Sequence, residues 1–304
     1  MSSVPVEVRG LVKRYGQRPV VDGVDLTVEA GDIYGYLGPN GAGKTTTLRM
    51  MLGLIRRDGG SVRLFGRDPA AGAAALEHVA GFVEAPTFYP YLSGRENLQF
   101  LATLDGGLPR RRLDEALDRV GLLDRAADRV GTYSLGMRQR LGIAASLMRS
   151  PKLLVLDEPA NGLDPAGMRD LRRLVSTLPE QGVTVLYSSH LLAEVEEVCT
   201  RVAIVNAGTI SFEGPLSQLR ESFAAPYRLE TADDERALVA ATASGASDAR
   251  IENGALWLDA APELVDRLTV ALGRAGIPIR SLTRERRTLE DLFFQLTEEE
   301  GQAA

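Results

Sequence analysis

Several residue types and patterns are scarce in this chain of 304 residues. Its one cysteine, Cys199, excludes an intramolecular disulfide, and its place in a helical apolar pattern favours a buried structural role. No apolar run approaches the roughly 18 residues of a membrane-spanning helix, and the N-terminal residues lack the pattern of a secretory signal. These absences predict a cytoplasmic globular protein. A chain of 304 residues is long enough for one large domain and a small one, or for two ordinary domains.

Lysine is also scarce, and acidic residues outnumber basic ones, 41 to 35. The formal net charge of −6 argues against broad electrostatic binding to nucleic acid, so no nucleic-acid partner is expected. The densest basic run, residues 110–112, is followed at once by acidic residues, which favours the solvated start of a helix over a groove for phosphates. The only lysines are Lys13, Lys44 and Lys152. One of these three stands in the most informative stretch of the chain.

That stretch, residues 38–46, satisfies the phosphate-loop pattern of Gly, four residues, Gly, Lys and Ser or Thr. Backbone N–H groups of the glycines would close around phosphate oxygens, Lys44 would reach the β- and γ-phosphates, and Thr45 would offer a hydroxyl to Mg²⁺. A strand over 32–37 is predicted to enter the loop, and a helix over 46–52 to leave it with its positive end toward the phosphates. A turn that binds nothing is the weaker alternative. The predicted nucleotide-binding residues are Gly38, Pro39, Asn40, Gly41, Ala42, Gly43, Lys44, Thr45 and Thr46.

Two apolar strands end in polar residues. The first, residues 152–159, has apolar residues on both faces and ends in Asp157 and Glu158, which indicates a covered, largely parallel sheet. Acids at the carboxyl end of such a strand lie where open α/β sheets bind ligands, although a surface strand can also end in acids. The second, residues 182–190, ends in His190. The other histidine, His78, lies in polar helical sequence and is interpreted as a surface residue.

The remaining segments up to residue 215 complete an α/β pattern. Alternating residues over 6–16 and 20–28, and a glycine-flanked segment over 59–66, predict antiparallel strands. Tyr15 has the flat face that suits an adenine ring, although an ordinary strand tyrosine explains it equally well. Helical spacing over 93–128 predicts a helical insertion, and the helix after Ser134 is similar to a second anion-binding helix start.

These motifs, in this order over about residues 6–215, resemble the ABC transporter ATPase family. The resemblance implies a P-loop NTPase of ABC type, with a parallel-sheet core, an antiparallel β subdomain and a helical subdomain at about 86–150, all within a nucleotide-binding domain over 1–223. It implies ATP as the nucleotide, adenine stacking at Tyr15 and Mg²⁺ binding by Thr45 and Asp157. It further implies that Glu158 is the general base, that His190 contacts the γ-phosphate and the attacking water, and that Asp164 helps two subunits communicate.

Two positions depart from the family pattern. Residues 133–137 read Tyr-Ser-Leu-Gly-Met in place of Leu-Ser-Gly-Gly-Gln. The expected γ-phosphate contacts, Ser134 and Gly136, remain, and the whole segment that would act across a dimer is Ser134, Leu135, Gly136 and Met137. Glu84 replaces a glutamine that reaches Mg²⁺; a carboxylate can also ligate Mg²⁺ but adds negative charge beside the triphosphate. Both departures resemble the exporter branch associated with bacitracin and lantibiotic resistance.

The resemblance predicts an ATPase that powers export of an antibiotic, amphipathic drug or peptide. The working unit is expected to be a homodimer docked on separate transmembrane permease subunits at the cytoplasmic face of the membrane, with the Glu84 loop and helical insertion as the docking surface. Importer energy coupling is the main alternative. A soluble ABC ATPase acting on the ribosome or chromosome is the other, although such chains usually carry a second cassette or a long coiled coil, and neither is found here.

Residues 224–304 are predicted to form an accessory domain. The pattern βαββαβ over residues 227–282 suggests a small ferredoxin-like α+β domain. A final helix capped by Thr288 would present one apolar face made of Leu289, Leu292, Phe293 and Leu296. That face is expected to dock on this domain or across a dimer.

Overall fold

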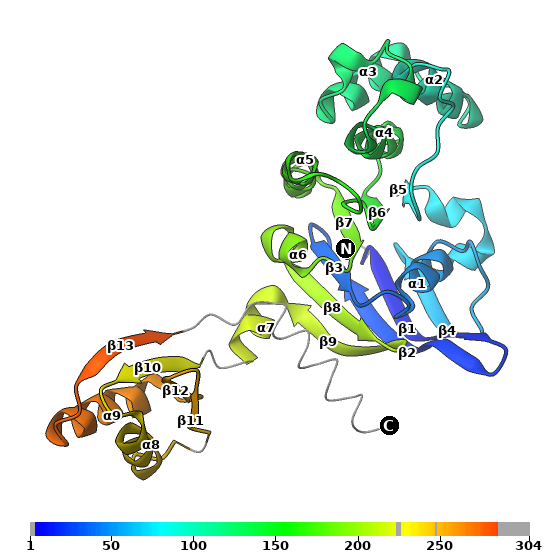
Figure 1. Ribbon diagram of the computed structural model, residues 1–304. Helices are drawn as coiled ribbons and strands as arrows, with labels where there is room; N and C mark the ends of the chain where they lie inside the picture. Colours follow the sequence, from blue (N-terminus) through cyan, green and yellow to red (C-terminus); the bar gives the residue numbers. More distant parts are fainter. Residues whose placement is uncertain (1–3, 223–225, 247, 285–304) are drawn as a thin grey trace. The chain divides into compact units, whose positions relative to one another are not determined.

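The computed structural model describes residues 4–222, 226–246 and 248–284. The chain forms two compact units, residues 1–216 and 217–304 (Figure 1). The helix predicted from Thr288 lies outside the described residues. No helix within the described ranges is long and apolar enough to cross a membrane.

A six-stranded sheet forms the centre of the first unit, in the order β5-β6-β7-β3-β8-β9. Neighbouring strands are parallel except for β8 and β9, which confirms the largely parallel sheet. Every residue of β3, β6 and β7 is buried, as expected for strands covered on both faces. The strands are β3 (Ile33–Leu37), β5 (Val79–Phe82), β6 (Leu153–Asp157), β7 (Thr184–Ser189), β8 (Arg201–Asn206) and β9 (Thr209–Pro215).

A smaller antiparallel sheet has the order β2-β1-β4, which confirms the antiparallel strands expected from the alternating segments. Its strands are β1 (Val6–Tyr15), β2 (Arg18–Val28) and β4 (Gly59–Leu64). Val8, Leu26 and Val62 from this sheet belong to the same buried cluster as Tyr36 of β3 and Leu48 of the phosphate-loop helix. This shared core fixes the loop between the two sheets.

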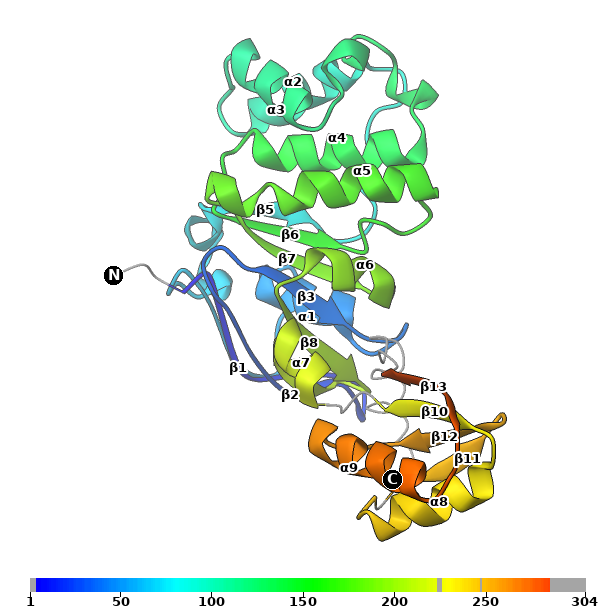
Figure 2. The same cartoon turned by 90° about the vertical axis from the view of Figure 1, so that its left-hand side faces the viewer.

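The helical insertion lies at the top of Figure 1, and its last helix contacts β5 of the six-stranded sheet. Its first helix begins with a capping box: Ser93 Oγ accepts from the Glu96 N–H at 3.2 Å, and Glu96 accepts from the Ser93 N–H at 2.7 Å. Its last helix, α4, packs beside α5 (Figure 2). The α-helices of this region and the core are α1 (Lys44–Met51), α2 (Gly94–Leu104), α3 (Arg110–Arg119), α4 (Leu135–Leu147), α5 (Pro165–Ser176) and α6 (Leu192–Val198).

The stretch around His78 differs from the polar helix expected there. It forms two short 3₁₀ turns, Pro69–Ala71 and Ala73–Leu76, before His78 stands in the turn that leads into β5. The His78 ring is half-buried and meets the Phe65 ring edge-on at 5.8 Å. Tertiary packing on Phe65 therefore decides its environment. Further 3₁₀ turns span Leu123–Arg125, Val130–Thr132 and Pro179–Gln181.

The second unit begins with α7 (Leu216–Ser222) at the boundary and continues in the predicted order βαββαβ. All pairs in its sheet are antiparallel, in the order β11-β12-β10-β13. Leu229, Leu256 and Leu268 lie in a core separate from that of the first unit. Its elements are β10 (Tyr227–Thr231), α8 (Asp234–Ala243), β11 (Arg250–Glu252), β12 (Ala255–Leu258), α9 (Pro262–Arg274) and β13 (Ile279–Arg284).

Candidate functional site

A tight loop joins β3 to α1 and supplies one wall of the site. Gly43 is the N-cap of α1 with φ 97°, and a Cβ there would stand 2.4 Å from the Val20 carbonyl oxygen. A Cβ on Gly38 would stand 2.4 Å from the Val205 carbonyl oxygen. Glycine is therefore required at both positions for the loop to fit between β2 and β8. The N–H groups at the start of α1 form the positive end of a helix, which favours an anion.

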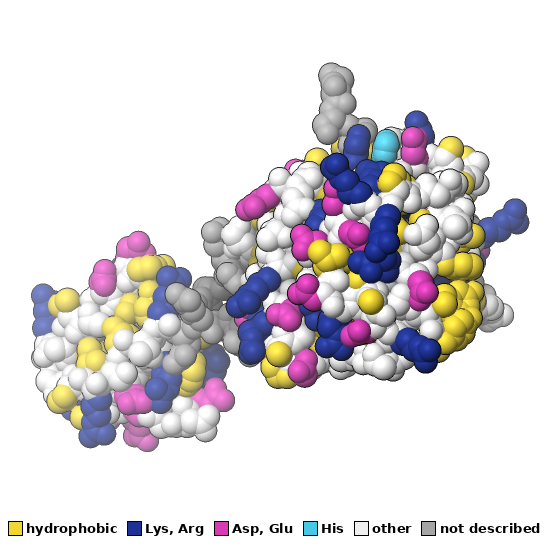
Figure 3. Space-filling model, turned by 90° about the horizontal axis from the view of Figure 1, so that it is seen from above, with side chains coloured by type: hydrophobic (Ala, Val, Ile, Leu, Met, Phe, Trp, Pro, Cys, Tyr) yellow, Lys and Arg dark blue, Asp and Glu magenta, His cyan; other side chains and the backbone are white. Residues whose placement is uncertain are grey.

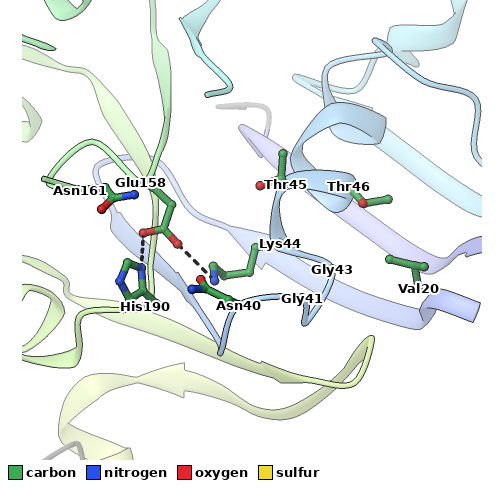
Figure 4. Close-up of a pocket in the computed structure, with 10 residues that line it drawn as sticks. All are labelled: Val20, Asn40, Gly41, Gly43, Lys44, Thr45, Thr46, Glu158, Asn161 and His190. Carbon is green, nitrogen blue, oxygen red and sulfur yellow. Dashed lines mark hydrogen bonds and ion pairs between the residues drawn. The ribbon is translucent and has the colours of Figure 1, made fainter. Parts of the chain in front are cut away.

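Lys44, the first residue of α1, folds back into this loop. Its side chain is 5% exposed, and Nζ donates to the carbonyl oxygens of Gly38 at 2.7 Å and Pro39 at 3.2 Å. Nζ also lies 3.2 Å from Glu158 Oε1 (Figure 4). A buried ammonium with only two neutral acceptors and one carboxylate is suited to exchange that carboxylate for a phosphate.

Glu158 links the loop to the far wall of the site. Its Oε2 lies 2.6 Å from His190 Nδ1, so the carboxylate stands between a lysine and a histidine (Figure 4). Glu158 follows β6 in the left-handed region, with φ 47°, a conformation that costs a non-glycine residue about 1–3 kcal/mol. Its N–H donates to the carbonyl oxygen of Ser188 at 3.2 Å and to Ser188 Oγ at 3.0 Å, which holds this turn in place.

Asp157 is directed to different partners. It is 3% exposed, and its two oxygens accept hydrogen bonds from Thr45 Oγ1 at 3.0 Å and Ser188 Oγ at 2.5 Å. The two adjacent acids therefore have different partners. Asp157 accepts from two hydroxyl groups, whereas Glu158 contacts Lys44 and His190. Ser188 supports both acids, and no distinct sequence signal marks it.

Oxygen donors at Thr45 and Asp157 fit Mg²⁺, which prefers oxygen ligands and usually takes one or two carboxylates together with substrate phosphates and water. No group of three or more His, Cys, Asp or Glu side chains that could hold a metal occurs within the described part of the chain.

A pocket of about 340 Å³ is lined by Lys44, Thr45, Glu158 and His190, whereas four predicted site residues do not line it: Gly38, Pro39, Ala42 and Asp157. Two of its lining residues, Val20 and Asn161, were not predicted. Val20 comes from β2 and had no sequence signal, whereas Asn161 follows the acidic strand end and its N–H bonds the Glu158 carbonyl oxygen at 3.1 Å. The full lining is Val20, Asn40, Gly41, Gly43, Lys44, Thr45, Thr46, Glu158, Asn161 and His190.

Other predicted site residues do not line this pocket. Tyr15 is 55% exposed, and the Lys13 ammonium lies 5.5 Å from its ring centroid. Ser134 caps α4 by accepting from the Met137 N–H at 3.2 Å. Asp164 caps α5 by accepting from the Gly167 N–H at 2.9 Å. Both caps have a structural role in this chain alone, and their roles across a dimer stay predictions.

Glu84 stands near this site without lining it. It has φ 71° and forms an ion pair with Arg49 of α1. Its side chain is 66% exposed. Its predicted contact with Mg²⁺ stays a prediction.

Comparisons with known proteins agree with this geometry. The sequence profile of the family described as ABC transporter matches residues 21–161. The chain is 40% identical to the uncharacterized ABC transporter ATP-binding protein YdbJ of Bacillus subtilis over 99% of both chains. It is 41% identical to the bacitracin transport ATP-binding protein BcrA of Bacillus licheniformis, over 79% of this chain and 78% of that protein. A solved ATP-binding subunit of an ABC transporter is 30% identical with a TM-score of 0.64, covering 72% of this chain and 92% of that one. The chain therefore belongs to the ABC transporter ATP-binding proteins.

Proposed function

We propose that this chain powers export of an antibiotic, amphipathic drug or peptide by hydrolysing ATP, through separate transmembrane subunits. The observation that carries the ATPase proposal is the Glu158 carboxylate held between Lys44 and His190, beside the Thr45–Asp157 pair. The export proposal is supported by the similarity to BcrA, whose name assigns it to bacitracin transport.

The phosphate loop is proposed to hold the nucleotide. Backbone N–H groups from residues 40–46 would surround the phosphates, while Lys44 would leave Glu158 and pair with the β- and γ-phosphate oxygens. Tyr15 would stack on the adenine, for which its exposed ring is available. Mg²⁺, held by Thr45 and Asp157, would neutralise phosphate charge.

Glu158 is proposed as the general base. Its carboxylate would accept a proton from the attacking water as the water oxygen bonds to the γ-phosphorus and the bond to the β–γ bridging oxygen breaks, giving ADP and phosphate. His190 would orient the carboxylate through the 2.6 Å contact and meet the γ-phosphate. Catalysis would thus depend mainly on positioning, as phosphoryl transfer requires.

A complete site is proposed to need two chains. Ser134 and Gly136 do not line the pocket of their own chain, and we propose that they close over the phosphate loop of a second copy. Ser134 stands at the N-terminus of α4, a 13-residue helix whose positive end favours the γ-phosphate. Asp164 at the start of α5 would transmit closure between the subunits.

The membrane subunit is proposed to dock beside β5 and the helical insertion, which would place the chain at the cytoplasmic face of the membrane. A pocket of about 250 Å³ there has apolar walls that include Phe82, Pro86, Phe88 and Leu101. Tyr91, in the same loop, is 65% exposed. Figure 3 shows charges of both signs interspersed over the first unit, with hydrophobic side chains gathered at the edge on the side where Figure 1 places α2. An apolar pocket beside exposed hydrophobic side chains suits the apolar face of an amphipathic helix.

Replacing the base tests the reaction. Glu158→Gln should abolish ATP turnover while ATP-dependent dimers still form, as measured by phosphate release and by size-exclusion chromatography with light scattering. Normal hydrolysis by this variant would reject Glu158 as the base. Co-purification with a multi-span membrane protein would support transport, whereas association with ribosomes or DNA in its place would reject it.

A further inference from the structure

Arg49 and Glu84 form an ion pair that the proposed mechanism does not yet use. Arg49 lies in the last turn of α1, and its Nη2 donates to Glu84 Oε1. Thr45 and Arg49 are four residues apart and therefore share one face of this helix. This face of α1 thus contacts two carboxylates that follow strands of the sheet. Thr45 contacts Asp157, and Arg49 contacts Glu84.

The sheet brings Glu84 and Asp157 to the same edge. β5 pairs in parallel with β6, with Phe82 opposite Leu156, so the residues that follow both strands emerge at neighbouring points. Asp157 is the last residue of β6, and Glu84 follows β5 by two residues. Glu84 therefore follows a strand next to the one that ends in Asp157, a proposed metal ligand. Its carboxylate is paired with Arg49.

We propose that Arg49 is a positioning residue for Glu84, so that Mg²⁺ must compete with the guanidinium for this carboxylate. The proposal rests on the proposed function. An additional carboxylate beside a triphosphate is unfavourable unless a cation compensates it, and arginine keeps its charge at every physiological pH. We call this ion pair the Arg49–Glu84 latch.

The exposure of the latch fits a reversible contact. The Arg49 and Glu84 side chains are 36% and 66% exposed, and ion pairs this accessible to water are weak. Binding of a Mg²⁺-nucleotide can therefore open the latch. The latch makes Glu84 available to the metal only when Mg²⁺ outcompetes Arg49.

The test is equilibrium binding of a fluorescent ATP analogue to the full chain at increasing free Mg²⁺, without turnover as the readout. Arg49→Gln should lower the half-saturating Mg²⁺ concentration about two- to five-fold, the factor expected for loss of a weak ion pair. Arg49→Lys keeps the charge and should respond as the wild type. Arg57→Gln is the matched control, since Arg57 pairs with Asp68 just after α1 and does not line the pocket.

The decisive variant combines Arg49→Gln with Glu84→Gln. If Arg49 acts through Glu84, removing the arginine should not change the Mg²⁺ dependence once the carboxylate is gone. An equal shift in both backgrounds would show that Arg49 acts directly on the metal by its charge, and no shift in the single variant would also overturn the latch. Wild-type nucleotide binding that is indifferent to Mg²⁺ would reject the latch alone, whereas absence of any nucleotide binding would reject the proposed function.

Discussion

The ion pair between Lys44 and Glu158 predicts that the Glu158→Gln variant binds ADP more tightly than the wild type does. The Lys44 ammonium is 5% exposed and the Glu158 side chain 21% exposed, with Nζ 3.2 Å from Oε1. Lys44 must leave this carboxylate to meet a phosphate, so every nucleotide competes with Glu158. Glutamine keeps an oxygen acceptor for the lysine but removes the charge, which lowers the cost of the exchange.

The magnitude follows from the burial of the pair. Exposed ion pairs contribute about 0.2–1 kcal/mol, and this one is more buried, so we expect about 1–2 kcal/mol. This corresponds to roughly five- to thirty-fold tighter binding. ADP is the ligand of choice because it lacks the γ-phosphate, whose repulsion by Glu158 would otherwise contribute. Omitting Mg²⁺ removes the effect of the metal.

Isothermal titration calorimetry with ADP measures this directly. Glu180→Gln, which removes one exposed carboxylate away from the pocket, provides the charge-matched control and should bind as the wild type does. Equal ADP affinities for Glu158→Gln and wild type, within a factor of two, would refute the competition. Glu180→Gln should unfold at the wild-type urea concentration, whereas Glu158→Gln, which loses the ion pair with Lys44, should unfold at a lower one.

Three further predictions concern stability and reactivity. Burial raises the pKa of the Cys199 thiol, so Ellman's reagent should leave the native chain unmodified at pH 8 and label one thiol in urea; rapid native labelling would contradict this. The backbone N–H of Ser93 is the main cause that lowers the pKa of Glu96 below its ordinary 4.5, so the carboxylate stabilises the fold above that pH and loses this effect as pH falls. The stability difference between wild type and Glu96→Gln should therefore shrink from about pH 6 to about pH 3 in urea titrations, and a constant difference would reject the effect. Gly81→Ala should lower the free energy of unfolding by about 3 kcal/mol or more, because its φ is 149° and a Cβ would stand 1.9 Å from a main-chain oxygen of β6. Gly59→Ala, whose Cβ would meet its nearest atom at 3.4 Å, is the control, and an equal loss in both variants would contradict this reason.

Much of the site could be predicted because its residues carry local signals. The phosphate-loop pattern indicated residues 38–46, and two buried strands ending in polar residues indicated Asp157, Glu158 and His190. The structure brings Lys44, Thr45 and those three residues together. The parallel sheet explains why, since the carboxyl ends of its strands meet at one edge.

Other parts of the site had no such signal. Val20 is an ordinary apolar residue in an alternating strand, and it lines the pocket only because β2 packs beside the phosphate loop. Ser188 is one of two consecutive serines at a strand end, and only the pairing of Asp157 with Ser188 reveals its support of both acids. The prediction that His78 lies in a polar helix was wrong, because tertiary contacts decide its environment too. The His78 ring packs against Phe65 in the turn before β5.

The sequence by itself determined the order of the elements, the glycine-rich loop and the residue types that meet phosphate, because backbone geometry and strand burial are encoded over a few neighbouring positions. Only the tertiary structure decided which of these side chains contact one another. Glu158 pairs with Lys44 and His190, Asp157 pairs with Thr45, and Arg49 holds Glu84. Each of these contacts joins residues more than thirty positions apart, and their distances depend on how the sheet aligns its strand ends against α1.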